Sequence, residues 1–122
     1  MIRLLRLCFW GAALFAFVMA VLPQPPELPG EPSDKIQHAL AFFTLAMLAA
    51  CAYPRLHPLA IAALLCLFGG VIEMVQLIPA LGREGDLIDW TVDTLAAGAG
   101  LLAVQIGRRA LRQRRSMQAQ RL

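Results

Sequence analysis

GGVIEMVQLIPALGREGDLIDWTVD, residues 69–93, decides the fold, because it ends one apolar segment and begins the next. Within or beside those segments it places charged or amide side chains at Glu73, Gln76, Arg83, Glu84, Asp86, Asp89 and Asp93. A carboxylate near the middle of a membrane helix costs about 2.5–3.5 kcal/mol on insertion scales. Such residues seldom face lipid and instead find partners inside a bundle. The stretch therefore predicts two membrane helices whose acidic residues point into the protein.

The composition of the whole chain agrees with a membrane protein. Of the 122 residues 59% are hydrophobic, whereas a soluble domain is typically about 45–50% apolar. The mean hydropathy is +0.65. The apolar runs approach the ~20 residues that cross a bilayer core. We predict an all-α integral membrane four-helix bundle forming a single domain over residues 1–122, with spans at about 4–22, 36–53, 59–78 and 87–107.

The ends of the first span and of the chain leave alternatives open. Residues 7–22 are either a retained helix or a cleaved signal peptide, and three further spans favour retention. The following segment, PQPPELPGEPS at residues 23–33, contains five prolines and predicts an extended loop. Ser33 or Asp34 can cap the next helix. The basic tail at 108–122 is expected either as a helix lying on anionic lipid or as a disordered segment.

The distribution of charge predicts the topology. Nine of the eleven basic residues lie in the first six residues, at Arg55 or after Gly107, and all eight acids lie between Glu27 and Asp93. By the positive-inside rule, both termini and the Arg55 loop face the cytoplasm. The chain is thus predicted to be a multi-pass protein of the cell membrane, the bacterial inner membrane in particular. A nucleic-acid partner is not expected, because the basic tail directly follows an apolar run and lacks interleaved aromatic residues.

Polar residues recur at one-turn spacing on three spans, as Asp34 and His38, Glu73 and Gln76, and Asp89 and Asp93. Each pair lies on one face of its helix. In the predicted topology all three pairs fall in the outer half of the membrane, so they can share one pocket. The candidate ligand-binding residues are Asp34, Lys35, His38, Glu73, Gln76, Arg83, Asp89 and Asp93.

These residues resemble the VanZ-like family, named for a teicoplanin-resistance membrane protein. The family pattern has Asp-Lys-x-x-His opening one span, Glu-x-x-Gln in the next, then Gly-Arg, then Asp and Asn before a glycine-rich helix. The matches here, over about residues 34–102, are Asp34, Lys35, His38, Glu73, Gln76, Gly82, Arg83 and Asp89. Asp93 replaces the usual Asn and adds a negative charge, and Ala96 stands where Gly is common. The resemblance implies a role near cell-envelope precursors, linked for some members to glycopeptide resistance.

Several roles are open for individual residues of the pocket. His38 is either a general base or metal ligand, or a neutral histidine bonded to Asp34 or Asp89. Glu73 is either catalytic or paired with Lys35 or Arg83. Asp89 and Asp93 could share a proton or a divalent cation. Arg83 could grip a phosphate or carboxylate, or pair with Glu84 or Asp86.

Three functions follow from these roles. The first is a binding or accessory protein that holds membrane lipid, either an anionic envelope lipid or a lipid-linked precursor, or that modifies surface access for a glycopeptide. The second is a membrane-embedded hydrolase or transferase acting on a lipid-linked phosphate, with or without a metal. Its catalytic candidates are His38, Glu73, Asp89 and Asp93. The third is a structural subunit, and the binding role is the one that the residues favour.

Overall fold

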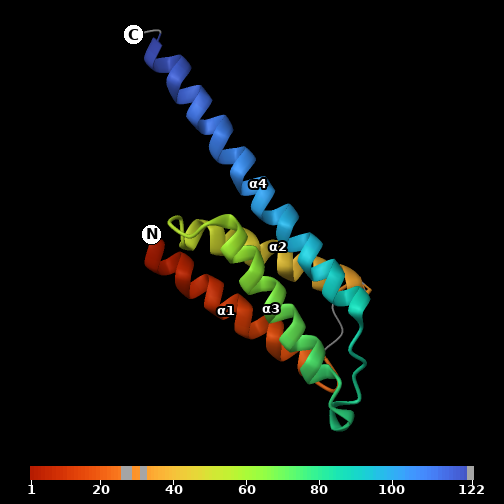
Figure 1. The fold of residues 1–122 in the computed structure, drawn as a ribbon. Helices are drawn as coiled ribbons and strands as arrows, with labels where there is room; N and C mark the ends of the chain where they lie inside the picture. The colour runs from red at the N-terminus through yellow and green to blue at the C-terminus, as the bar shows by residue number, and fades with distance from the viewer. Residues whose placement is uncertain (26–28, 31–32, 121–122) are drawn as a thin grey trace.

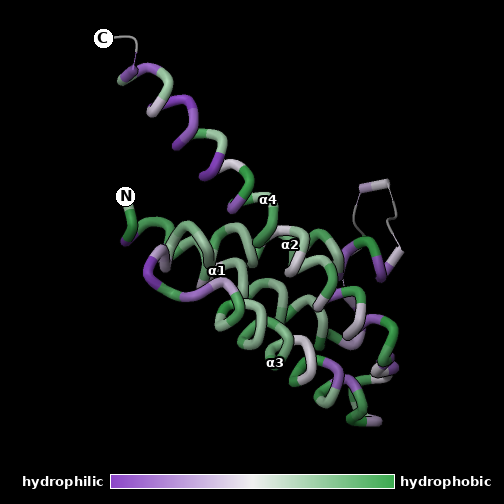
Figure 2. The backbone as a smooth tube through the Cα atoms, turned by 45° about the horizontal axis from the view of Figure 1, so that its top comes forward, coloured by the Kyte–Doolittle hydropathy of each residue, from purple (hydrophilic) through white to green (hydrophobic). Residues whose placement is uncertain are grey.

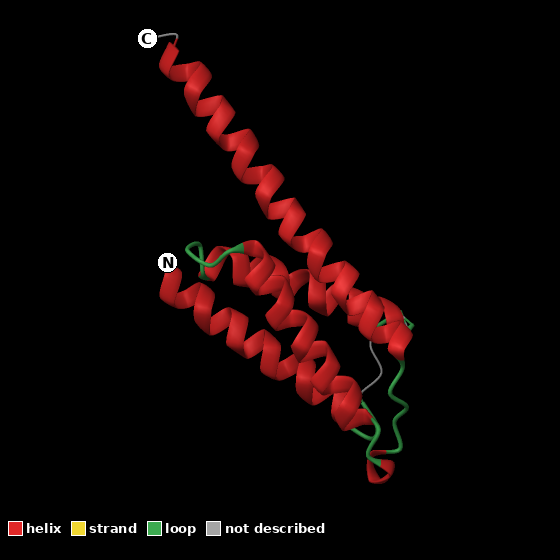
Figure 3. Ribbon diagram, in the orientation of Figure 1, coloured by secondary structure: helices red, strands yellow, loops and turns green. Residues whose placement is uncertain are grey.

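The computed structural model describes residues 1–25, 29–30 and 33–120, and the regular structure in these ranges is helical (Figures 1 and 3). In chain order the elements are α1 (Ile2–Val21), α2 (Asp34–Ala52), α3 (Pro58–Gln76), the short 3-10 helix η1 (Pro79–Leu81) and α4 (Leu87–Gln120). All four α-helices are long and apolar enough to cross a membrane. The all-α, four-helix prediction is therefore confirmed for the described residues.

The helix boundaries lie within two residues of the predicted spans at every end except the last. α3 ends at Gln76 rather than at residue 78, because Pro79 cannot continue a helix and instead begins η1. α4 continues without a break from the fourth span through residue 120, so the tail is helical and not disordered over its described part. Two predictions fall partly outside the described residues. These are the extended loop, at residues 26–28 and 31–32, and the tail, at residues 121–122.

Three of the helices have a side chain that caps their N-terminus. Ser33 Oγ accepts a hydrogen bond from the Ile36 amide at 3.4 Å, so Ser33 is the cap of α2. His57 Nδ1 accepts from the Leu59 amide at the start of α3, where Pro58 takes the first position. Asp86 Oδ1 accepts from the Ile88 amide at 2.9 Å and caps α4.

The helices run so that the two ends of the bundle carry different connections (Figure 1). The N-terminus, the α2–α3 turn and the second half of α4 lie at one end, which we call the basic end. The α1–α2 and α3–α4 connections lie at the other, the acidic end. Hydrophilic residues gather at both ends, and the projecting half of α4 is the longest hydrophilic segment in view (Figure 2).

Helix α2 lies at the centre of the bundle and packs most closely on α4. Its buried side chains, among them Phe42, Leu45 and Ala46, meet residues of α3 and α4 such as Ile72 and Ala97. The α2–α4 contact is tightest at Gly100, where an added Cβ would lie 2.6 Å from the Phe43 carbonyl oxygen. Small residues allow this main-chain approach, as is usual for helices packed in lipid.

The outer surface of the bundle is apolar, as lipid requires. On α1 the side chains of Leu7, Trp10, Leu14 and Phe15 are each more than 60% exposed, and α3 and α4 expose further leucines. α1 nevertheless packs on the bundle through Ala13 and through Phe17, whose ring lies 6.4 Å from that of Phe68. A surface of this kind contacts hydrocarbon in a membrane-spanning protein.

Candidate functional site

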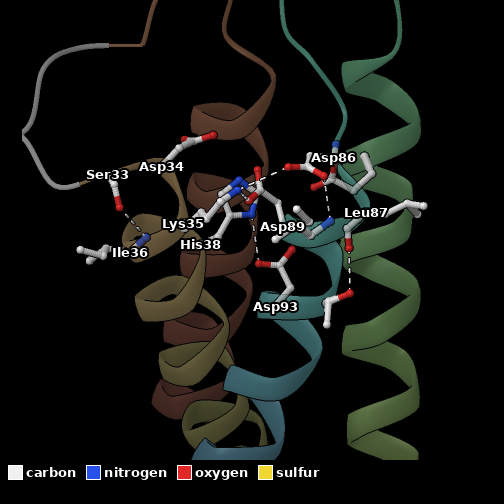
Figure 4. A network of polar contacts seen from close by, with 12 residues as sticks. Ser33, Asp34, Lys35, Ile36, His38, Asp86, Leu87, Asp89 and Asp93 are labelled. Atoms are coloured by element: carbon white, nitrogen blue, oxygen red, sulfur yellow. Dashed lines mark hydrogen bonds and ion pairs between the residues drawn. The ribbon is translucent and has the colours of Figure 1, made fainter.

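Ionisable side chains of α2 and α4 meet at the acidic end (Figure 4), and α3 adds another there. The first turns of α2 supply Lys35 and His38, the last turns of α3 supply Glu73, and the first turns of α4 supply Asp89 and Asp93. We call these five residues the polar cluster. Four of them are buried, whereas the Lys35 side chain is half exposed. The one-turn spacing seen in the sequence therefore does place the polar faces of three helices against one another.

The centre of the polar cluster is a buried pair between α2 and α4. His38 Nδ1 lies 3.0 Å from Asp93 Oδ1, with the imidazole 7% and the carboxylate 0% exposed. When Nδ1–H donates to Asp93, the lone pair of the ring is on Nε2, which is then available as a base or a ligand. The predicted partners of His38, Asp34 and Asp89, are thus wrong as hydrogen-bond partners. The pair lies one turn deeper on α4 than Asp89.

Lys35 joins the ends of α2 and α4 at the surface of the cluster. Its Nζ donates to Asp89 Oδ1 at 2.7 Å and to Asp86 Oδ2 at 3.4 Å. The Asp89 side chain is only 9% exposed, so Lys35 balances a largely buried charge. This pairing gives Asp89 a cation partner of its own, and the sharing of a proton or an ion between Asp89 and Asp93 stays a prediction.

Glu73 is held by main chain rather than by a cation. Its Oε2 accepts a hydrogen bond from the Asp86 amide at 2.6 Å. The predicted ion pair with Lys35 or Arg83 is therefore replaced by a contact with the residue that caps α4. Glu73 Oε1 and Asp93 Oδ2 are both buried, and neither has a hydrogen-bond partner among the described residues. Two buried carboxylate oxygens are thus left without a donor.

The remaining predicted site residues lie around the cluster. Gln76 donates from Nε2 to the Ala20 carbonyl at 2.9 Å and so ties α3 to the end of α1. Arg83 Nη2 lies 3.7 Å from Asp34 Oδ1, in place of the expected pairing with Glu84 or Asp86. Asp34 is exposed, and Arg83 is mostly covered. Gln76 therefore has a structural contact, and the Asp34–Arg83 pair forms the rim of the site.

Two residues of the α3–α4 connection contribute more than the sequence suggested. Asp86 caps α4, donates its amide to Glu73 and accepts from Lys35. The hydrogen bond from the Ile88 amide, helped by Lys35, lowers the pKa of the Asp86 carboxyl below its ordinary value. Gly85 lets the chain pass Glu73, because a Cβ there would lie 2.7 Å from the Glu73 carbonyl. An aspartate just before an apolar helical run was the available signal.

Two groupings of side chains at the acidic end could hold a metal ion. His38, Glu73 and Asp93 have ligand atoms within 4.8 Å of one another and are all buried, and Asp34, His38 and Asp89 form a second such group. His38 belongs to both.

Comparison with models of protein families, with curated proteins and with solved structures finds no match for this chain. The chemistry of the site is therefore argued from its own residues.

Proposed function

We propose that the chain is a VanZ-like integral membrane protein of the cell envelope, with a binding or accessory role exercised at its acidic end. The order of its motifs supports the family, from Asp34-Lys35-x-x-His38 through Glu73-x-x-Gln76 to Asp89. The proposed orientation has both termini in the cytoplasm, because the arginines gather at the basic end. The acidic end then faces the outer surface of the bacterial inner membrane.

The observation that carries the binding role is the pair of cations at the rim. Lys35 and Arg83 contact exposed carboxylates, Asp86 and Asp34, whose side chains are 42% and 55% exposed. Exposed ion pairs contribute only about 0–1 kcal/mol. An anionic headgroup, the phosphate of an envelope lipid or of a lipid-linked precursor, can therefore compete with these two exposed carboxylates while Lys35 keeps its contact with Asp89, and it gains charge-assisted hydrogen bonds. Occupancy of this rim is how the protein would change access of a glycopeptide to the surface.

Lipid co-purification tests the binding role. The full chain is purified in mild detergent, and its bound lipids are compared by mass spectrometry for the wild type, Lys35→Gln and Arg83→Gln. Arg55→Gln, which removes an exposed arginine at the basic end, is the matched control. We expect the two rim variants to lose at least tenfold of the bound anionic lipid and the control to retain it. Equal lipid content in all four proteins would rule out this rim as the binding site.

The orientation needs a separate measurement. In a chain whose natural cysteines are replaced by serine, Glu84→Cys and Gln118→Cys report on the acidic end and on the tail. A membrane-impermeant maleimide added to intact cells should label position 84 and spare position 118 until the membrane is opened. Labelling of position 118 from outside would overturn the orientation.

A membrane-embedded hydrolase or transferase acting on a lipid-linked phosphate is the second candidate function. The observation in its favour is the buried His38–Asp93 pair, in which a carboxylate orients an imidazole as general bases require. Release of phosphate from a lipid pyrophosphate by the wild type, and its loss in His38→Gln, would support this activity. Turnover that is unchanged in His38→Gln would exclude it.

A further inference from the structure

The buried part of the polar cluster has more negative charge than its protein partners can balance. Asp89 is matched by Lys35 at 2.7 Å. Glu73 and Asp93, in contrast, share only the neighbouring His38 imidazole, and Asp93 is fully buried. A buried carboxylate that lacks a compensating charge or hydrogen bond is costly to keep in a low-dielectric interior. Something further must neutralise this pair of acids.

The unpartnered atoms show where the missing group lies. Glu73 Oε1 and Asp93 Oδ2 are buried without hydrogen-bond partners in the described part of the chain. The other oxygen of each carboxylate is already fixed, Glu73 Oε2 by the Asp86 amide and Asp93 Oδ1 by His38. Both side chains are therefore oriented by protein contacts, and each leaves one oxygen free in the interior of the bundle.

The third donor is the imidazole between them. His38, Glu73 and Asp93 have ligand atoms within 4.8 Å of one another. Ligand atoms lie about 2.0–2.2 Å from a divalent transition metal, so atoms on opposite sides of one ion are about 4 Å apart. A spacing within 4.8 Å is close to this value, so small side-chain rotations would bring the three ligand atoms onto one ion. Because Asp93 ligates the same ion, the imidazole would bind it through Nδ1, and the ion would replace the proton between Nδ1 and Asp93 Oδ1.

We infer that His38, Glu73 and Asp93 form a buried site for one divalent first-row transition-metal ion, of the class of Zn²⁺ and Mn²⁺. Two carboxylates neutralise a divalent charge, and the single imidazole selects against Ca²⁺ and Mg²⁺, which prefer oxygen ligands throughout. The inference does not depend on the proposed lipid-binding role, since it uses the buried atoms rather than the rim.

The acidic end also offers the ion a way in. Asp34, His38 and Asp89 form a second grouping with the same 4.8 Å spacing, which runs from an exposed carboxylate to a buried one and shares His38 with the inner site. Gly69 allows Asp93 Oδ2 to lie close to α3, because an added Cβ there would lie 3.2 Å from that oxygen. An ion entering from the acidic end would thus pass from exposed to buried carboxylates without leaving oxygen ligands.

Metal binding to the full chain in detergent tests the site. The protein is stripped with a chelator and equilibrated with Mn²⁺, which has little affinity for the cysteine thiols. Bound metal is measured by elemental analysis and by the loss of the free Mn²⁺ electron paramagnetic signal. We expect one Mn²⁺ per chain, displaced by Zn²⁺ but not by equal concentrations of Mg²⁺ or Ca²⁺. A stripped wild type that binds no Mn²⁺ would overturn the site and leave a proton as the neutralising group.

Two glutamates of the chain provide a matched pair of variants. Glu73→Gln removes a ligand charge and keeps an oxygen that can accept from the Asp86 amide, whereas Glu84→Gln removes an exposed acid at the same end. We expect at least tenfold weaker Mn²⁺ binding in Glu73→Gln and unchanged binding in Glu84→Gln. Equal affinities in the two variants would show that bound metal lies elsewhere. If Glu73→Gln fails to fold, Asp93→Asn replaces it under the same criterion, and the melting temperature of the wild type must fall with chelator and recover with Mn²⁺.

Discussion

At the acidic end of the bundle, charged side chains pair with one another across helices, whereas at the basic end arginines pair with main-chain carbonyls. Arg108 Nη2 donates to the Ala50 carbonyl at 2.8 Å, and Arg6 Nε donates to that of Ala52 at 3.4 Å. Arg6 also lies 5.0 Å from the centre of the Tyr53 ring. These contacts satisfy the last carbonyls of α2, which have no partner within the helix.

The difference between the ends shows which polar residues have a structural role in the fold. Arg6 and Arg108 complete a helix terminus from the two chain ends, and the favourable field of the α2 C-terminus adds to their binding. At the acidic end, by contrast, pairing is incomplete, because Glu73 and Asp93 each keep a buried oxygen without a partner among the described residues. The buried oxygens that lack hydrogen-bond partners, rather than the number of charges, distinguish the acidic end as the candidate site.

The largest expected effect comes from removing the central partner of the acidic end. His38→Ala leaves the Asp93 carboxylate buried and unpaired, which typically costs about 3–5 kcal/mol. In an Asp93→Asn background the same change removes a partner from a neutral amide, so the cost should fall to about 1–3 kcal/mol. Unfolding is measured in detergent with chelator present, so that metal does not contribute. Equal costs in both backgrounds would mean that His38 and Asp93 are not coupled.

A smaller effect is expected at the basic end. Arg108→Gln removes the hydrogen bond to the Ala50 carbonyl and should lower the free energy of unfolding by about 1–2 kcal/mol. The adjacent Arg109 is exposed, and Arg109→Gln removes the same charge from the same turn of α4. It should leave stability within about 0.5 kcal/mol of the wild type. If both variants lose stability equally, charge and not carbonyl capping is what Arg108 supplies.

The smallest effect concerns the pH dependence of the Asp86 cap. Because hydrogen bonding to Ile88 lowers the pKa of Asp86, its contribution to stability is complete above the ordinary aspartate pKa of about 3.9. That contribution is lost as the pH falls through the lowered value. Asp86→Asn keeps a cap acceptor but takes up no proton there, so its melting temperature should fall less between about pH 5 and pH 2. Glu84→Gln is the control. If the melting temperature of Asp86→Asn falls as much as that of the wild type over this pH range, the prediction is contradicted.

The sequence predicted the helices and their polar faces better than the contacts between them. Apolar length fixes the number of spans, and one-turn spacing places His38, Glu73 and Asp93 on defined faces. The partners were missed because they depend on how far each helix is rotated about its own axis, which is set by packing across the bundle. Thus His38 meets Asp93 rather than Asp34, which precedes it by one turn on the same helix.

The connection and the tail show two further limits. Asp86 directly precedes the predicted fourth span, yet its amide binds Glu73, and no side-chain pattern reveals a main-chain donor. In the tail, many arginines suggested either disorder or a surface helix. Arginine, glutamine, alanine and leucine all have good helix propensity, and α4 continues through them to Gln120.

The close approach of α4 to α2 at Gly100 determines how well polar side chains of these two helices align at the acidic end. Gly100 lies seven residues beyond Asp93, about 10 Å along α4 at 1.5 Å per residue. A methyl group in place of its hydrogen would have to retreat from the Phe43 carbonyl by about 1 Å to reach an ordinary contact distance. A rigid shift of α4 by this distance along the line of the His38–Asp93 contact would lengthen it from 3.0 Å to about 4 Å, beyond hydrogen-bonding range. The contact between His38 and Asp93 thus depends on the lack of a Cβ at Gly100, two turns away on α4.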